Sequence, residues 1–155
     1  MIDPTPIAAP LDLALPATGG KIVNLADACS EKLVLFFYPK DNTPGCTNEA
    51  RDFGALHADF ADAGCTVLGI SRDSLKSHEN FKAKLELPFD LLSDTDEAAC
   101  KAFGVIKLKN MYGKQARGIE RSTFVFAVGG KLARAWRGVK VPGHAAEALA
   151  FVRAL

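Results

Sequence analysis

Residues 32–46 read KLVLFFYPKDNTPGC, an apolar run followed at once by the start of a helix. A continuous apolar run is typical of a strand covered on both faces, so KLVLFFY is predicted to lie in the middle of a sheet. Thr43 suits the N-cap of a helix, and Pro44 suits its first helical position. The segment therefore places the thiol of Cys46 in the first turn of a helix that follows a central strand.

The neighbouring segments predict further strands and helices of an α/β fold. LDLAL (11–15) and KIVNL (21–25) alternate around the turn PATGG and predict an N-terminal β-hairpin. Apolar residues at helical spacing extend the helix that contains Cys46 as far as Gly64. CTVLGIS (65–71) predicts a second buried strand, and an apolar stripe over Leu75–Leu85, followed by Pro88, predicts another helix.

The carboxyl-terminal half completes this pattern. DLLSD (90–94) predicts a short strand, and the residues from about 95 to 103 predict a helix. The segment KLKNMYGKQARGIER (107–121) predicts a polar loop. STFVFAV (122–128) and KLARAWR (131–137) predict an antiparallel hairpin, and a last helix starts at Gly143. The predicted fold class is therefore α/β, a thioredoxin-like fold (β-α-β-α-β-β-α core) with an N-terminal β-hairpin extension. Sheets of this kind bind ligands at the carboxyl ends of their central strands, where Cys46 lies.

The composition predicts one cytoplasmic domain over residues 1–155. A chain of 155 residues with 48% hydrophobic content can build one compact core. Its 19 Lys and Arg against 18 Asp and Glu exclude a broad electrostatic attraction to nucleic acid or to a membrane surface. Residues 1–20 lack a basic lead and an unbroken apolar run, so neither a signal peptide nor an anchor is expected. The 4 cysteines are accordingly expected to be reduced.

Cys46 has two interpretations, a buried structural sulfur or a reactive thiolate. Backbone N–H groups in a first helical turn have no carbonyl partner within the helix, and such donors favour a thiolate. A free cysteine has a pKa of about 8.5, and a helix N-terminus with a basic neighbour can lower such a value to roughly 3.5–7.5. Lowering the pKa of Cys46 to about 6 requires about 3.4 kcal/mol. The helix terminus alone usually contributes about 0.3–1 kcal/mol, so a cation must also be present. Thr43 stands where a dithiol oxidoreductase has the first cysteine of C-x-x-C, so no local disulfide can form.

The segment YPKDNTPGCTNEA, with GISRDS, LPFDLLSD and GIERSTFVF around it, resembles the peroxiredoxins, in the branch of the bacterioferritin comigratory protein or peroxiredoxin Q. The proline, threonine and cysteine of that family match Pro39, Thr43 and Cys46, and its active-site arginine matches Arg121. The resemblance implies a thiol peroxidase whose thiolate attacks hydrogen peroxide or an organic hydroperoxide and becomes a sulfenic acid. Arg121, Thr43 and the N–H of Cys46 would bind the peroxide oxygens, and Pro39 would shield the sulfur. Glu49, on the same helix face as Cys46, would orient Arg121.

The resemblance leaves the recycling step open. Many relatives have a resolving cysteine five positions after the reactive one, where this chain has Arg51, and the helix predicted over Leu75–Leu85 contains none either. Cys100 and Cys29 are the internal candidates; Cys29 is expected to be accessible in a polar loop, whereas Cys65 is expected to be inert in a buried strand. The alternative is an external thiol such as thioredoxin, glutaredoxin or glutathione. The resemblance further implies a monomer that needs no metal, flavin or haem.

Two functions from other classes stay open on the residues alone. A cysteine hydrolase or acyltransferase would pair Cys46 with a histidine base, and a thioredoxin-like binding module or redox sensor would use the same thiol without turnover. The 3 histidines, His57, His78 and His144, form no H-x-x-x-H motif and do not pair closely with a cysteine, so no zinc site is expected.

Overall fold

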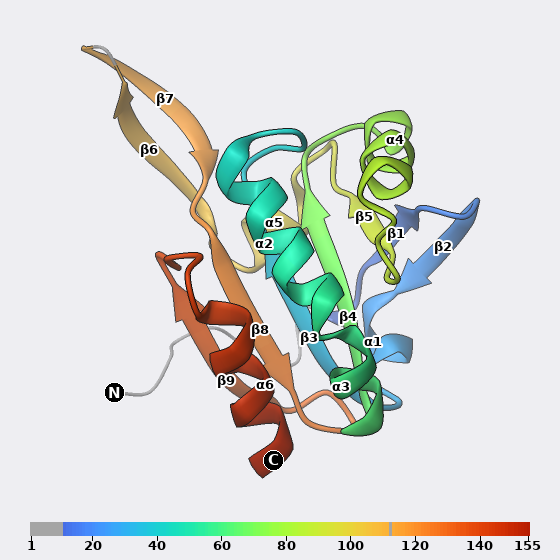
Figure 1. Ribbon diagram of the computed structural model, residues 1–155. Coiled ribbons are helices and arrows are strands. Elements are labelled where there is room, and N and C mark those ends of the chain that lie inside the picture. The colour runs from blue at the N-terminus through green and yellow to red at the C-terminus, as the bar shows by residue number, and fades with distance from the viewer. Residues whose placement is uncertain (1–10, 112) are drawn as a thin grey trace.

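The computed structural model describes residues 11–111 and 113–155. The prediction that there is no signal peptide was made on residues 1–20, of which residues 1–10 lie outside the described residues. A seven-stranded sheet has the order β2-β1-β5-β4-β3-β8-β9, and β6 and β7 form a separate two-stranded sheet (Figure 1). The strands are β1 Ala14–Ala17, β2 Lys21–Asn24, β3 Lys32–Phe37, β4 Cys65–Ser71, β5 Leu91–Ser93, β6 Ile106–Met111, β7 Lys114–Ile119, β8 Ser122–Phe126 and β9 Leu132–Arg137.

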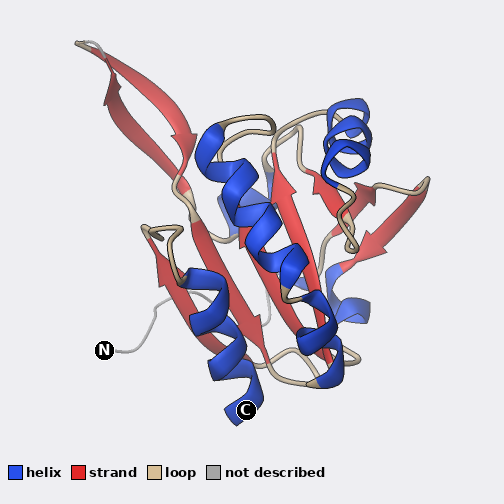
Figure 2. Ribbon diagram, in the orientation of Figure 1, coloured by secondary structure: helices blue, strands red, loops and turns tan. Residues whose placement is uncertain are grey.

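Helices cover both faces of the large sheet (Figure 2). They are α1 Leu25–Ala28, α2 Pro44–Ala55, α3 His57–Asp62, α4 Leu75–Leu85, α5 Ala98–Ala102 and α6 His144–Ala154. Buried residues of α2, α3, α4 and α6 form a core on one face, and those of α1 and α5 form a core on the other. This confirms the thioredoxin-like α/β fold. Along the described part of the chain, no helix has both the length and the apolar character that a membrane crossing requires.

Strand β3 is central, as predicted. It pairs in parallel with β4 and antiparallel with β8, so both of its edges are occupied. Its side chains alternate between the two cores because successive residues of a strand point to opposite faces. Leu33, Leu35 and Phe37 belong to the core under α1 and α5. Val34 and Phe36 belong to the core under α2 and α6, which explains the unbroken apolar run.

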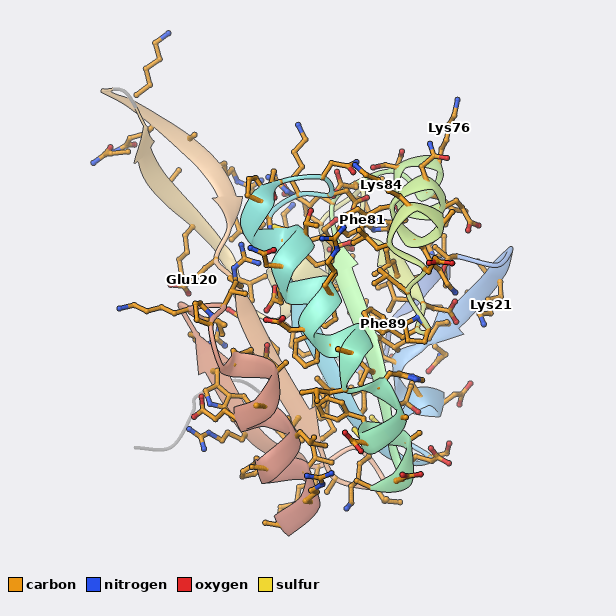
Figure 3. The ribbon with its side chains drawn as sticks, in the orientation of Figure 1. Lys21, Lys76, Phe81, Lys84, Phe89 and Glu120 are labelled. Atoms are coloured by element: carbon orange, nitrogen blue, oxygen red, sulfur yellow. The ribbon has the colours of Figure 1, made fainter. Side chains whose placement is uncertain are left out.

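Aromatic packing fixes α2 on the sheet. The ring of Phe53 stacks on that of Phe36 with centroids 4.6 Å apart. Figure 3 shows Phe81 and Phe89 in the layer between α2 and α4, and the Phe89 ring meets Phe36 edge-on at 5.7 Å. A Cβ on Gly69 would lie 2.8 Å from Phe36, so β4 needs glycine at this position to admit the ring. This packing anchors the second half of α2, where Ala50 and Phe53 are buried.

The single helix predicted from Thr43 to Gly64 is wrong, because the chain bends at Leu56. Leu56 has φ −98° and ψ 4°, and it ends α2 and caps α3. Both helices turn an apolar side to the same core, so the helical spacing of apolar residues continues across the bend. His57, predicted on the same helix as Cys46, instead begins α3.

Three further predictions need correction. Residues 107–111 and 114–119, predicted as part of a loop, instead belong to β6 and β7, which pair antiparallel, and Gly113 between them has a φ of 78°. The polar loop predicted around Cys29 contains helix α1, capped by the side chain of Asn24. Helix α5 starts at Ala98 rather than near residue 95, because Glu97 has a left-handed φ of 65° that no continuing helix allows.

Candidate active site

The candidate site lies where β3 ends and α2 begins. Thr43 is the N-cap residue of α2 with extended backbone angles, and Pro44 occupies the first turn, both as predicted. The Thr43 hydroxyl does not cap the helix but donates to the carbonyl oxygen of Lys40 at 2.8 Å. The first-turn N–H groups at Gly45 and Cys46 have no partner within the helix. They are available to a thiolate or to a bound peroxide.

The guanidinium of Arg121 lies against the sulfur of Cys46. Arg121 Nη2 donates to Cys46 Sγ at 3.4 Å, although the two residues are 75 positions apart in sequence. Arg121 directly precedes β8, whose antiparallel pairing with β3 brings it to the same end of the sheet as α2. Cys46 is only 2% exposed. The predicted cation is therefore present beside a thiol that is shielded from water.

Gly45 is a site residue that the sequence analysis missed. A Cβ at this position would lie 3.1 Å from Arg121 Nη2, so a side chain there would push the guanidinium away. The sequence shows a glycine between Pro44 and Cys46, but the group that needs the space, the guanidinium of Arg121, comes from a distant part of the chain, directly before β8.

Glu49 holds the other end of the guanidinium. Arg121 Nη1 donates to Glu49 Oε1 at 2.7 Å, with side-chain exposures of 16% and 1%. Burial raises the pKa of Glu49 to about 7, and the charge of Arg121 only partly opposes this. Burial by itself would lower the pKa of Arg121, but Glu49 and then Cys46 raise it, so the guanidinium stays charged. Among the described residues, no donor reaches Glu49 Oε2.

The structure joins Cys46, Arg121 and Glu49 by direct contacts. Pro39 and Thr43 are partly buried and belong to the loop between β3 and α2, so they are connected to Cys46 through the backbone. The five residues predicted for the site thus gather at one end of the sheet, three of them in contact and two on the adjacent loop.

The other three thiols lie away from this site. Cys29 and Cys100 belong to the core on the opposite face of the sheet from Cys46, and Cys65 lies at the amino end of β4. Cys29 is 1% exposed, so its predicted accessibility is wrong; α1 turns it inward, beside Gly130. Burial raises the pKa of all three thiols, that of Cys65 to about 12. As buried thiols, they are poor nucleophiles.

Comparison with known proteins identifies the family. The sequence model of the AhpC/TSA family matches residues 8–135. The chain belongs to this family. It is 55% identical to Peroxiredoxin Bcp of Xanthomonas campestris, over 95% of this chain and 92% of that protein. It is 49% identical to Peroxiredoxin Bcp of Bacillus subtilis, over 89% of this chain and 88% of that protein.

Solved structures agree with these relatives. Peroxiredoxin Q of Xanthomonas campestris superposes with a TM-score of 0.90 at 55% identity, covering 95% of this chain and 93% of that one. A PrxQ mutant of Xylella fastidiosa superposes with a TM-score of 0.91 at 47% identity, covering 99% and 96%. The chain is therefore a peroxiredoxin, an enzyme that reduces peroxides with a thiol. The peroxidase prediction is confirmed, and it is favoured over the hydrolase and the binding module.

Proposed function

We propose that the peroxidase reaction takes place at Cys46, assisted by Arg121, Thr43, Pro39 and Glu49, and that an external thiol recycles the enzyme. The observation that carries the proposal is the contact of 3.4 Å between Arg121 Nη2 and Cys46 Sγ at the start of α2. This contact places a cation beside the sulfur, and such a cation is needed because a helix terminus alone stabilises a thiolate too weakly.

The chemical step transfers one oxygen atom to sulfur. The Cys46 thiolate gives an electron pair to the terminal peroxide oxygen, an S–O bond forms and the O–O bond breaks. The sulfur is oxidised to a sulfenic acid, and the other oxygen leaves as water or alcohol after it gains a proton. Negative charge develops on that leaving oxygen. Arg121 and the first-turn N–H groups are fixed donors that stabilise it, and a donor of this kind is typically worth about 10²–10³ in rate.

Pro39, Thr43 and Glu49 support this step in different ways. The Thr43 hydroxyl donates to Lys40, so its lone pairs remain to accept from a peroxide hydrogen. Pro39 shields the thiol from bulk water. Glu49 orients the guanidinium through the 2.7 Å contact. One solved relative, the Xanthomonas campestris bacterioferritin comigratory protein, is described in terms of alkyl peroxide reduction. This supports organic hydroperoxides as substrates beside hydrogen peroxide.

The position of the other cysteines supports an external reductant. To reach Cys46, Cys29 and Cys100 would have to cross the sheet. Cys65 would have to pass along β4, whose seven residues span roughly 20 Å. An external thiol attacks the sulfenic acid, forms a mixed disulfide and releases water, and a second thiol then frees Cys46. Thioredoxin, glutaredoxin and glutathione have this chemistry.

The reductant also bears on location and assembly. Such thiols are kept reduced in the cytoplasm, which we propose as the compartment; the 4 unpaired cysteines agree with it. We further propose a monomer as the active unit, since Cys46, Glu49 and Arg121 of a single chain are enough to make these contacts.

Mass spectrometry of reduced protein after one equivalent of hydrogen peroxide tests the proposal. We expect the addition of one oxygen, trapped by dimedone on the peptide that contains Cys46, and no trapping in Cys46→Ser. A triple variant with Cys29, Cys65 and Cys100 changed to serine should turn over with glutathione or thioredoxin as the wild type does. A loss of two hydrogens, with an internal disulfide in the wild type, would refute the external reductant.

A further inference from the structure

A buried polar cluster holds the loop between β3 and α2. The carboxylate of Asp41, 3% exposed, accepts hydrogen bonds from Tyr38 Oη at 2.7 Å and Ser77 Oγ at 2.8 Å. Its Oδ2 also lies 2.7 Å from His78 Nδ1. Ser77 and His78 come from the first turn of α4, so the cluster ties the loop to a helix that follows another strand.

His78 bridges the loop to strand β5. The imidazole is 0% exposed, and its Nε2 lies 2.9 Å from the carbonyl oxygen of Leu92. A carbonyl oxygen only accepts, so Nε2 carries a hydrogen and donates it. Nδ1 faces a carboxylate that already has two other donors. Each ring nitrogen of His78 thus has an acceptor opposite it, and the ring has no room to turn without losing both contacts.

The backbone of the loop is held as well. The N–H of Asp41 donates to Asp73 Oδ2 at 2.9 Å. Asn42, the next residue, has a φ of 63°, a left-handed conformation that asparagine adopts readily as a single residue in a turn. Thr43 then starts α2, three residues before Cys46. Contacts at Asp41 therefore determine the path of the chain into the first turn of α2.

We propose that Asp41 and His78 are positioning residues for the peroxidase site. They touch neither Cys46 nor Arg121, but they hold the loop in the conformation that places Thr43 and the first turn of α2 beside the guanidinium. The proposal rests on Cys46 as the reacting residue.

The two half-reactions depend on this loop in opposite ways. Oxidation needs Cys46 to stay in line with its fixed donors, and a displacement of about 1 Å in such an arrangement can cost roughly 10²-fold in rate. Reduction needs the opposite, because a sulfenic acid at a residue that is 2% exposed must open toward an external thiol. Release of the loop should therefore slow oxidation and speed reduction.

His78→Leu and Asp41→Asn test the proposal by separating these steps. Stopped-flow oxidation by hydrogen peroxide should slow by roughly 10- to 100-fold in both variants. Single-turnover reduction of the preformed sulfenic acid by glutathione should become faster. Hydrogen exchange of the amides of residues 41–43 and 45–47 should also become faster. A loss of general stability alone would not move the two rate constants in opposite directions.

Asp94→Asn is the matched control. Asp94 is also fully buried, and it accepts from the N–H groups of Ala99 and Cys100, on α5 rather than on the loop. This variant should lose stability and keep both rate constants. If His78→Leu does not fold, Ser77→Ala replaces it in the test, because it removes one donor to Asp41. Ser77→Ala should slow oxidation and speed reduction, each by a smaller factor.

Three results would overturn the proposal: an unchanged oxidation rate in His78→Leu, an equal loss in Asp94→Asn, or reduction slowed together with oxidation. Failure of the underlying function would be recognised separately, because the wild type itself would then form no sulfenic acid at Cys46.

Discussion

Replacement of Arg121 by methionine separates two roles of the guanidinium, the stabilisation of sulfur and oxygen charge and the neutralisation of Glu49. Arg121 Nη2 is 3.4 Å from Cys46 Sγ, a distance at which two unit charges interact by about 5 kcal/mol with an effective dielectric constant of about 20. Glu49, 2.7 Å from Nη1, offsets part of this. The loss of one fixed donor typically costs about 10²–10³ in rate, and we expect oxidation by hydrogen peroxide to slow by that factor.

The same change leaves Glu49 buried without its cation. Removal of one partner from a buried ion pair costs about 3–5 kcal/mol when the remaining group stays charged. The pKa of Glu49 is already about 7 with Arg121 in place, so at pH 5 the carboxyl is protonated and the cost is small. At pH 8 the wild-type carboxylate is ionised, and Arg121→Met should lose stability there. The double variant with Glu49→Gln should regain stability at pH 8 but not the rate of oxidation.

Two measurements check this reasoning. Competition with horseradish peroxidase for hydrogen peroxide gives the oxidation rate constant, and urea unfolding at pH 5 and pH 8 gives the free energy of unfolding. If the double variant recovered the oxidation rate as well as stability, Arg121 would act only by neutralising Glu49. The proposed donor role would then be refuted.

Three further predictions concern the carboxyl, the hydroxyl and the core. The pKa of Glu49 is about 7 in the folded state and 4.5 ordinarily, so between pH 4.5 and pH 7 the folded state binds a proton that the unfolded state has lost. The free energy of unfolding should therefore fall by about 3 kcal/mol as pH rises through this range. Urea unfolding should show no such fall in Glu49→Gln. Thr43→Val removes the hydroxyl that we propose accepts a hydrogen bond from the peroxide, and it should slow oxidation by roughly 10-fold in the competition assay, whereas Thr43→Ser should keep most of the rate. Phe53→Ala should cost about 3–5 kcal/mol in urea unfolding because its ring stacks on Phe36, while Ile22→Ala, at a site 67% exposed, should change little.

Local patterns in the sequence were sufficient for the elements that position Cys46. An unbroken apolar run requires two covered faces, and β3 has them. A capping residue followed by proline marks a helix start, and α2 begins there. Arg121 was found differently, by resemblance to a family, because no local rule connects residues 75 positions apart. Its contact with the sulfur depends on the antiparallel pairing of β8 with β3.

The features that were missed depend on contacts across the fold or on backbone pairing without a core. The hairpin β6–β7 has mainly exposed residues on β7, so it shows no alternation of apolar and polar positions. The bend at Leu56 preserves apolar spacing and is invisible to it. Asp41 and His78 are 37 positions apart, and although His78 falls on the apolar stripe predicted over Leu75–Leu85, no local pattern connects it to Asp41. Only the approach of α4 to the loop makes them a buried pair.

The electrostatics of the site imply that oxidation itself prepares the next step. In the proposed mechanism, Cys46 reacts as a thiolate that pairs with Arg121 Nη2, and this attraction helps to hold the first turn of α2 closed. A sulfenic acid is uncharged, so that attraction is lost once the oxygen has been transferred. The rest of α2 stays anchored, because Ala50 and Phe53 are buried in the core. Opening is therefore confined to the loop and the first turn, and its free-energy cost falls after peroxide has reacted, when an external thiol needs access.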